Sequence, residues 1–165
     1  MTMDQREMTV PIGGVYRGDG DSWCRRILVP VRAADQAYPA MAEAARICGL
    51  TGGVLRLVHV RTSDPPLPIV GRSYLETPGE ATAVLEEALL AAWACGGPRA
   101  TTVVVDARRG DVAAAIAWQA AAWPADLIVL TRRPRPAISR LIRVSVPDQV
   151  MRRASCPVLA IRRPR

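Results

Sequence analysis

Lysine and phenylalanine are absent from this sequence of 165 residues, and histidine occurs once, at His59. The four cysteines are far apart and form no CxxC pair, so we expect buried free thiols rather than a zinc site or a disulfide scaffold. P-loops, nucleophile elbows and paired carboxylates are also missing. A lone histidine at the end of an apolar run is typical of a buried, hydrogen-bonded side chain rather than a general base. We therefore predict no catalytic residues, no metal, no cofactor and no enzymatic activity.

No apolar stretch is long enough to cross a membrane, since the most apolar region, Val112 to Leu130, is interrupted by a glutamine, a proline and an aspartate. The first residues also lack the charged and then apolar pattern of a secretory signal. Half of the residues are hydrophobic, which is enough to form one core of domain size. We expect a single cytoplasmic domain.

All 22 basic residues are arginines, and they exceed the 15 acidic residues to give a net charge of +7. From Thr131 to the end there are ten arginines and one acid, Asp148, so the preceding part of the chain carries a small negative charge. Arginine binds phosphate and carboxylate groups through a planar pair of donors. A solvated surface also explains such a cluster, and both interpretations stay open.

Apolar strands and amphipathic helices alternate along the chain after residue 24. The pattern predicts strands at 26–31, 54–60, 101–105, 126–130 and 157–162, and helices at 35–47, 77–95, from 110 onward, and at 145–153. Such alternation is typical of a parallel sheet with helices on both faces. Residues 1–24, which contain several glycines and mixed charges, are interpreted as a flexible arm before an α/β domain of residues 25–165.

Two of these helices begin with recognisable caps. Thr77 to Glu80 forms a capping box with proline at the first helical position, and Ser145 with Asp148 three residues later matches a similar pattern. The first of the two helices is expected to bury Ala83, Leu85, Ala88, Leu89 and Trp93. The connection before it contains three prolines between residues 63 and 68, and we predict that it is a lid or a partner surface.

Three segments carry a resemblance to a known family: RRILVPV from Arg25, GDVAAAIAWQAAAWPADLIVL from Gly110 and SVPDQVMRRASCPVLAIR from Ser145. From about residue 25 to residue 163, the chain resembles the universal stress protein family. The resemblance implies a Rossmann-like α/β fold, with a five-stranded parallel sheet in the order 3-2-1-4-5. It also implies that the last strand, residues 157–162, lies at an edge and pairs with a second copy to form a homodimer.

The resemblance further places a ligand crevice between the carboxyl ends of the first and fourth strands. In nucleotide-binding members, the loop after the fourth strand reads glycine, two residues, glycine, nine residues, glycine and then serine or threonine. Only the serine of this motif is retained here, and an arginine at position 32 stands where these members have an aspartate. The residues that the resemblance assigns to the site are Pro30, Arg32, Val58, Thr131, Arg132, Arg133, Pro134, Arg135, Val144, Ser145 and Val146.

The three replaced glycines, now Thr131, Pro134 and Val144, argue against ATP binding in the family manner. Proline has no N–H to donate to a phosphate, and a β-branched residue is strained at the positive φ that glycine adopts. Our hypothesis is a non-enzymatic regulatory module of the stress response that acts by contact with a protein. One alternative is a sensor that binds a phosphorylated or acidic small molecule through Arg32, Arg132, Arg133 and Arg135. A second, less favoured alternative is a nucleic-acid binder that uses the carboxyl-terminal arginines.

Overall fold

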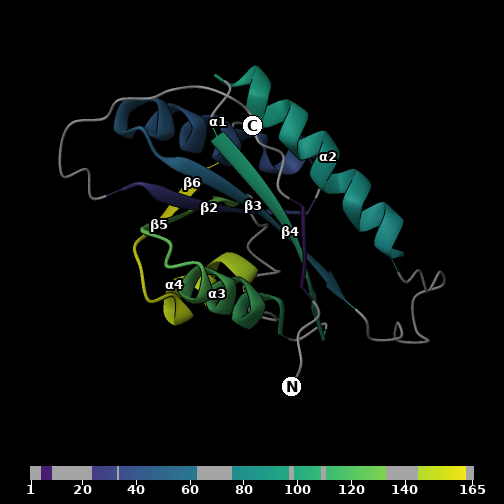
Figure 1. Ribbon diagram of the computed structural model, residues 1–165. Helices are drawn as coiled ribbons and strands as arrows, with labels where there is room; N and C mark the ends of the chain where they lie inside the picture. Colours follow the sequence, from purple (N-terminus) through teal and green to yellow (C-terminus); the bar gives the residue numbers. More distant parts are fainter. Residues whose placement is uncertain are drawn as a thin grey trace.

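The structure is a computed structural model, and it describes residues 5–8, 24–32, 34–62, 76–96, 99–108, 111–132 and 145–162. The strands in these ranges are β1 (Gln5–Met8), β2 (Arg26–Val31), β3 (Val54–Thr62), β4 (Arg99–Ala107), β5 (Leu127–Arg132) and β6 (Val158–Arg162). The helices are α1 (Ala34–Thr51), α2 (Pro78–Ala94), α3 (Val112–Ala122) and α4 (Val146–Arg153), and Figure 1 shows their arrangement around the sheet.

The strands form one sheet in the order β1-β4-β3-β2-β5-β6. The five strands from β2 to β6 are mutually parallel, and they confirm the predicted order 3-2-1-4-5 with the last strand at an edge. The remaining strand, β1, pairs antiparallel with β4 at the opposite edge, from Gln5↔Val105 to Met8↔Thr102. The sequence analysis predicts no strand in the arm. Apart from β1 and Cys24, the arm lies outside the described residues.

Helices α1 and α2 cover one face of the sheet, and α3 and α4 cover the other (Figure 1). Successive side chains of a strand point to opposite faces, so the side chains of β2 belong alternately to two cores. Ile27 and Val29 belong to the core beneath α1 and α2, whereas Leu28 belongs to the core beneath α3 and α4. Because both faces are covered, the central strands are apolar at almost every position.

Local sequence signals fix the start of α2. Thr77 is its N-cap, its side chain accepts a hydrogen bond from the backbone N–H of Glu80, and the Glu80 carboxylate accepts from the backbone N–H of Thr77. The predicted capping box is therefore confirmed. The predicted buried face is partly wrong, because Ala83 and Trp93 are exposed. The residues that are buried are Ala81, Leu85, Ala88 and Ala92, and three alanines among them allow the helix to lie close to the sheet.

Helix α1 is longer than the sequence predicts. It continues through Gly49 to Thr51, and ends where Gly52 takes a φ of 65°, which a side chain would disfavour. A single glycine inside a helix costs only about 1 kcal/mol, so Gly49 does not end α1. None of the helices in the described ranges combines the length and apolar character that a membrane span requires.

Candidate functional site

The central strands β2 and β5 are joined at their amino ends and separate toward their carboxyl ends. Their backbone pairing consists of Ile27↔Leu127 and Leu28↔Ile128, whereas β2 pairs with β3 as far as Val31. At the amino ends, the Asp126 carboxylate accepts hydrogen bonds from the backbone N–H groups of Arg25 and Arg26, at 2.9 and 2.8 Å. The chain leaves β2 toward β3 and leaves β5 toward β6, and the point where the connections diverge is where parallel sheets bind ligands. This carboxyl-end opening is the candidate site.

The structure places five of the predicted site residues around this opening, on or directly after β2, β3 and β5. Pro30 and Thr131 are partly buried, Val58 is fully buried, and Arg32 and Arg132 are exposed. The side-chain oxygen of Thr131 is buried and has no hydrogen-bond partner among the described residues. Four further predicted residues, Arg133, Pro134, Arg135 and Val144, lie outside the described residues, as does the connection of residues 63–75.

The start of α4, where a phosphate would be expected, is occupied by side chains of the chain itself. Ser145 is the predicted N-cap, and its Oγ accepts from the Asp148 backbone N–H at 3.2 Å. The same hydroxyl donates to Asp148 Oδ2 at 2.5 Å. The second carboxylate oxygen, Asp148 Oδ1, lies 3.0 Å from Nη2 of Arg132 at the end of β5. Ser145 and Arg132 therefore come together as predicted, but both contact Asp148.

The backbone of this helix start also has few donors to offer. The first helical residues are Val146, Pro147 and Asp148, and proline has no N–H. The N–H of Asp148 is directed to the Ser145 side chain, so neither Pro147 nor Asp148 presents an N–H to a ligand at this turn. Val146, which the sequence analysis assigns to the site, is 39% exposed. A usual helix N-terminus presents several such groups to an anion.

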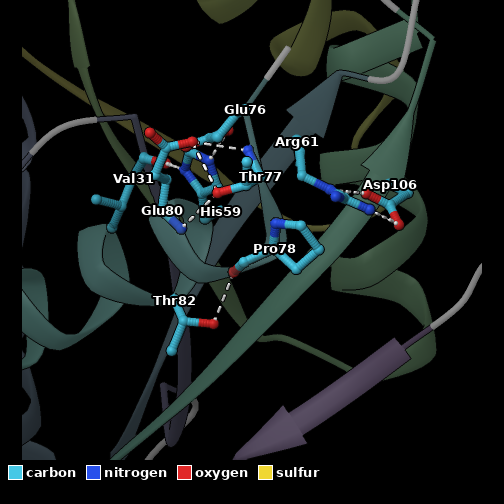
Figure 2. Close-up of polar contacts among 9 residues, drawn as sticks. All are labelled: Val31, His59, Arg61, Glu76, Thr77, Pro78, Glu80, Thr82 and Asp106. Carbon is cyan, nitrogen blue, oxygen red and sulfur yellow. Dashed lines mark hydrogen bonds and ion pairs between the residues drawn. The ribbon is translucent and has the colours of Figure 1, made fainter.

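Two further side-chain pairs, one between His59 and Glu76 and one between Arg61 and Asp106, lie at the carboxyl ends of β3 and β4 (Figure 2). His59 is buried, and it bonds through Nδ1 to the Val31 carbonyl oxygen at 2.8 Å and through Nε2 to Glu76 Oε2 at 2.7 Å. This confirms the prediction of a buried, hydrogen-bonded histidine. Arg61 makes a bidentate contact with Asp106, its register partner on β4, at 2.5 and 2.7 Å. Sequence reasoning assigns no role to Glu76, Arg61 or Asp106.

The cysteines do not contribute to the site. Burial raises the pKa of the Cys48 thiol to about 12, and it also raises the pKa of Cys24 and Cys156. Thiols of this kind carry almost no thiolate near neutral pH and react slowly. Within the described ranges, no group of three or more potential ligand side chains could hold a metal ion.

Comparison with known proteins gives a consistent result. A family model described as "Universal stress protein family" matches residues 24–162. A crystal structure of a universal stress protein in complex with cAMP is similar with 23% identity and a TM-score of 0.67, covering 85% of this chain and 98% of that one. The universal stress protein from Archaeoglobus fulgidus in complex with dAMP is 25% identical, with a TM-score of 0.59 and coverage of 85% and 99%. The protein UspA from Lactobacillus plantarum is 23% identical, with a TM-score of 0.59 and coverage of 86% and 100%. The comparison with curated proteins gave no match.

Proposed function

Because this chain belongs to the universal stress protein family, we propose that it is a regulatory module of that family, without enzymatic activity, that does not bind ATP in the family manner. The observation that carries the proposal is the Asp148 carboxylate at the start of α4. It lies against Ser145, the one residue of the glycine motif that the sequence retains, and it is paired with Arg132. The chain supplies its own anion at the position where relatives of the nucleotide-binding type would take a phosphate.

The charge of Asp148 opposes a bound phosphate. Two unit charges of the same sign repel by about 4 kcal/mol at a separation of about 4 Å in an effective dielectric of about 20. Arg132, which would offset this repulsion, is already paired with the carboxylate. The missing N–H of Pro147 removes one more interaction, and a hydrogen bond to a charged group contributes about 1.5–3 kcal/mol. The repulsion from Asp148 and the lost hydrogen bond together are at least as large as the binding free energy of a millimolar ligand, which is about 4 kcal/mol.

Calorimetric titration with ATP, ADP and cyclic nucleotides tests the proposal. The solved relatives in complex with cAMP and dAMP make these ligands the relevant ones to try. We expect no saturable binding up to a ligand concentration of about 1 mM. Micromolar affinity for ATP would overturn the proposal. An ATP hydrolysis assay on the same sample tests the absence of enzymatic activity, and turnover that survives further purification contradicts it.

A second candidate function, a sensor of phosphorylated or acidic small molecules, is supported by the two described arginines at the opening. The last paired residues of β2 and β5 are Leu28 and Ile128, and Arg32 and Arg132 each follow one of them by four positions. Arginine is well suited to bind such anions. If this candidate is right, titration with inorganic phosphate gives salt-sensitive binding that Arg32→Ala abolishes. Absence of binding at low salt excludes it.

We also propose that the protein forms a homodimer through the edge strand β6. The outer edge of β6 has no neighbouring strand among the described residues, and the segment is apolar from Val158 to Ile161. An open, apolar edge of this kind favours pairing with a second copy. Light scattering at several protein concentrations should give the mass of two chains. A single-chain mass at all concentrations contradicts this proposal and leaves the nucleotide proposal unaffected.

A further inference from the structure

We propose that His59 is a positioning residue that ties the carboxyl end of β2 to the start of α2. The tie has two halves, a hydrogen bond to the Val31 carbonyl and a contact with the Glu76 carboxylate (Figure 2). The first of the two contacts is made to the end of β2, which borders the carboxyl-end opening. The existence of the tie is independent of any ligand, and only its consequence for binding rests on the proposed function.

The contact with Val31 determines where the ring carries hydrogen. A carbonyl oxygen can only accept, so Nδ1 must donate to the Val31 oxygen at 2.8 Å. The ring therefore keeps a hydrogen on Nδ1, and Nε2 is the nitrogen that faces Glu76. Backbone pairing between β2 and β3 ends at Val31↔His59, so this side-chain bond lies at the last paired position of β2.

The contact with Glu76 gives the second nitrogen a partner that favours a proton. Nε2 lies 2.7 Å from Glu76 Oε2, and the lone pair of Nε2 would repel a carboxylate at this distance unless a proton lies between the two atoms. The ring is only 4% exposed and the Glu76 side chain is 26% exposed. The pair is therefore shielded from water mainly on the histidine side, where an unpaired charge would be most costly.

Among the described residues, the charged groups that flank the ring on β3 and α2 have other partners. Arg61, two residues farther along β3, is paired with Asp106 of β4. On α2, the Glu80 carboxylate accepts from the backbone N–H and the hydroxyl of Thr77. Arg32 of β2 follows Val31 and is exposed. Glu76 is thus the one acidic side chain among these groups that contacts the ring.

The two halves of the tie join the end of β2, which borders the opening, to the start of α2. Val31 lies between Pro30 and Arg32, two residues assigned to the site. Glu76 directly precedes Thr77, whose capping box fixes the first turn of α2. Through His59, the end of β2 and the start of α2 are held as one unit, and a displacement of either is transmitted to the other.

Nitrogen NMR of the imidazole ring tests the tie directly, because the chain contains a single histidine. We expect Nδ1 to carry a hydrogen that is bonded to the Val31 oxygen, and the Nε2 signal to report the contact with Glu76. In Glu76→Gln the Nε2 signal should change, because an amide replaces the carboxylate that faces it, whereas the Nδ1 signal should stay close to that of the wild type. The matched control Asp106→Asn removes a carboxylate from the same edge that bonds to Arg61, and it should change the Nε2 signal far less. An Nε2–H tautomer, or equal shifts in the two variants, overturns the proposal.

Amide hydrogen exchange tests the positioning role. Asparagine at position 59 can still donate to the Val31 oxygen but is too short to reach Glu76, whereas leucine loses both contacts. We expect His59→Leu to speed exchange at both Arg32 and Thr77 by about five- to tenfold, the equivalent of about one hydrogen bond. His59→Asn should speed exchange at Thr77 and leave Arg32 close to wild type. A uniform increase throughout the sheet would show a packing role only, and the proposal would then be wrong.

These outcomes are separable from those of the proposed function. The NMR and exchange experiments use the protein without ligand, and the calorimetric titration uses nucleotides. ATP binding with an intact tie would overturn the proposed function alone. If the NMR and exchange experiments contradict the two contacts of His59 and ATP does not bind, the positioning role alone is overturned. If His59→Leu does not fold, the Nε2 signal of Glu76→Gln and the wild-type tautomer still decide the proposal.

Discussion

The two ends of the β2–β5 strand pair use acidic side chains in opposite ways. At the amino ends, one carboxylate, Asp126, accepts hydrogen bonds from two backbone N–H groups of the neighbouring segment, and the Asp126 N–H donates to the Arg26 carbonyl. At the carboxyl ends, the carboxylates of Glu76, Asp106 and Asp148 contact the side chains of His59, Arg61 and Arg132. Acids bonded to the backbone fix the course of the chain. Acids bonded to side chains can exchange partners when a ligand or another protein arrives.

The difference shows where the fold depends on polar contacts and where it does not. Backbone N–H groups at the amino ends have to be satisfied in any conformation that keeps the sheet. The ion pairs at the carboxyl ends are partly exposed, and pairs of this kind contribute little to stability. We therefore expect changes at the amino ends to unfold the protein, and changes at the carboxyl ends to alter what the protein binds.

The largest effect is expected for Asp126→Ala at the amino ends. This change removes two charge-assisted hydrogen bonds to the backbone, and the free energy of unfolding should fall by about 3 kcal/mol. Urea denaturation measures the difference. Asp126→Asn keeps an oxygen that can accept both bonds and loses the charge, so it should cost about half as much. A loss below about 1 kcal/mol in the alanine variant would contradict the distinction between the two ends.

The next effect concerns Cys48, whose backbone carbonyl accepts a hydrogen bond from the N–H of Gly53, just before the amino end of β3. The pKa of its thiol is about 9 in the unfolded chain and about 12 in the folded protein, because burial disfavours the thiolate. As pH rises above 9, the unfolded state loses the proton first. The stability present below pH 9 is therefore lost between pH 9 and 12, by about 1.4 kcal/mol per pH unit.

Urea denaturation at pH 8 and pH 10 measures this loss. Cys48→Ala has no thiol at that position, so its stability should fall less between the two pH values than that of the wild type. Cys24 and Cys156 are present in both proteins and do not affect the comparison. If the wild type and the variant lose equal stability between pH 8 and pH 10, Cys48 ionises as readily in the folded protein as in the unfolded chain.

At the carboxyl ends, Asp148→Ala should cost about 1 kcal/mol of stability, since the helix start loses the carboxylate that contacts the Ser145 hydroxyl. It should also create binding of inorganic phosphate at about millimolar affinity, because Arg132 and Ser145 are released. Asp148→Asn retains an oxygen for Ser145 and removes only the charge. It should keep the stability and still gain phosphate binding. If neither variant binds phosphate, Asp148 is not the group that prevents phosphate from binding at the start of α4.

The smallest effect is expected for the Arg61–Asp106 pair. Its side chains are 22% and 29% exposed, so water screens the attraction, and a double-mutant cycle should give a coupling of about 0.5–1 kcal/mol. Arg61→Met, Asp106→Asn and the double variant complete the cycle in urea denaturation. A coupling near the loss expected for Asp126→Ala would mean that the carboxyl ends are as important for stability as the amino ends.

The sequence predicts the fold because its signals are local and repeated. Apolar strands alternate with capped helices, and the capping box at Thr77 and the N-cap at Ser145 both occur as predicted. The prediction of buried residues fails where the same helical spacing fits two different faces of the helix. Trp93 follows the helical spacing of the buried face of α2, but the small residue Ala92 occupies that position and Trp93 is 42% exposed. The polar strand β1 has no periodicity that could distinguish it from a loop.

The site is less predictable, because its contacts join residues that are distant in sequence. Ser145 and Arg132 are identified from the motif, but the role of Asp148 between them depends on the approach of β5 to α4. The partner of His59 is 17 residues away in the sequence, after a connection whose length does not indicate which residues come into contact. Arg61 and Asp106 face each other only because β3 and β4 pair in register over nine residues. Each of these contacts requires the tertiary fold.

The antiparallel strand β1 has a consequence for assembly. It pairs with Thr102 to Val105 of β4, so a strand added along that part of the sheet would meet an edge of four residues, which offers few backbone groups. A sheet with long free edges on both sides can add copies without limit and grow into a fibre. If the proposed pairing across β6 holds, the short β1 edge leaves the two-fold pair little backbone on which to extend.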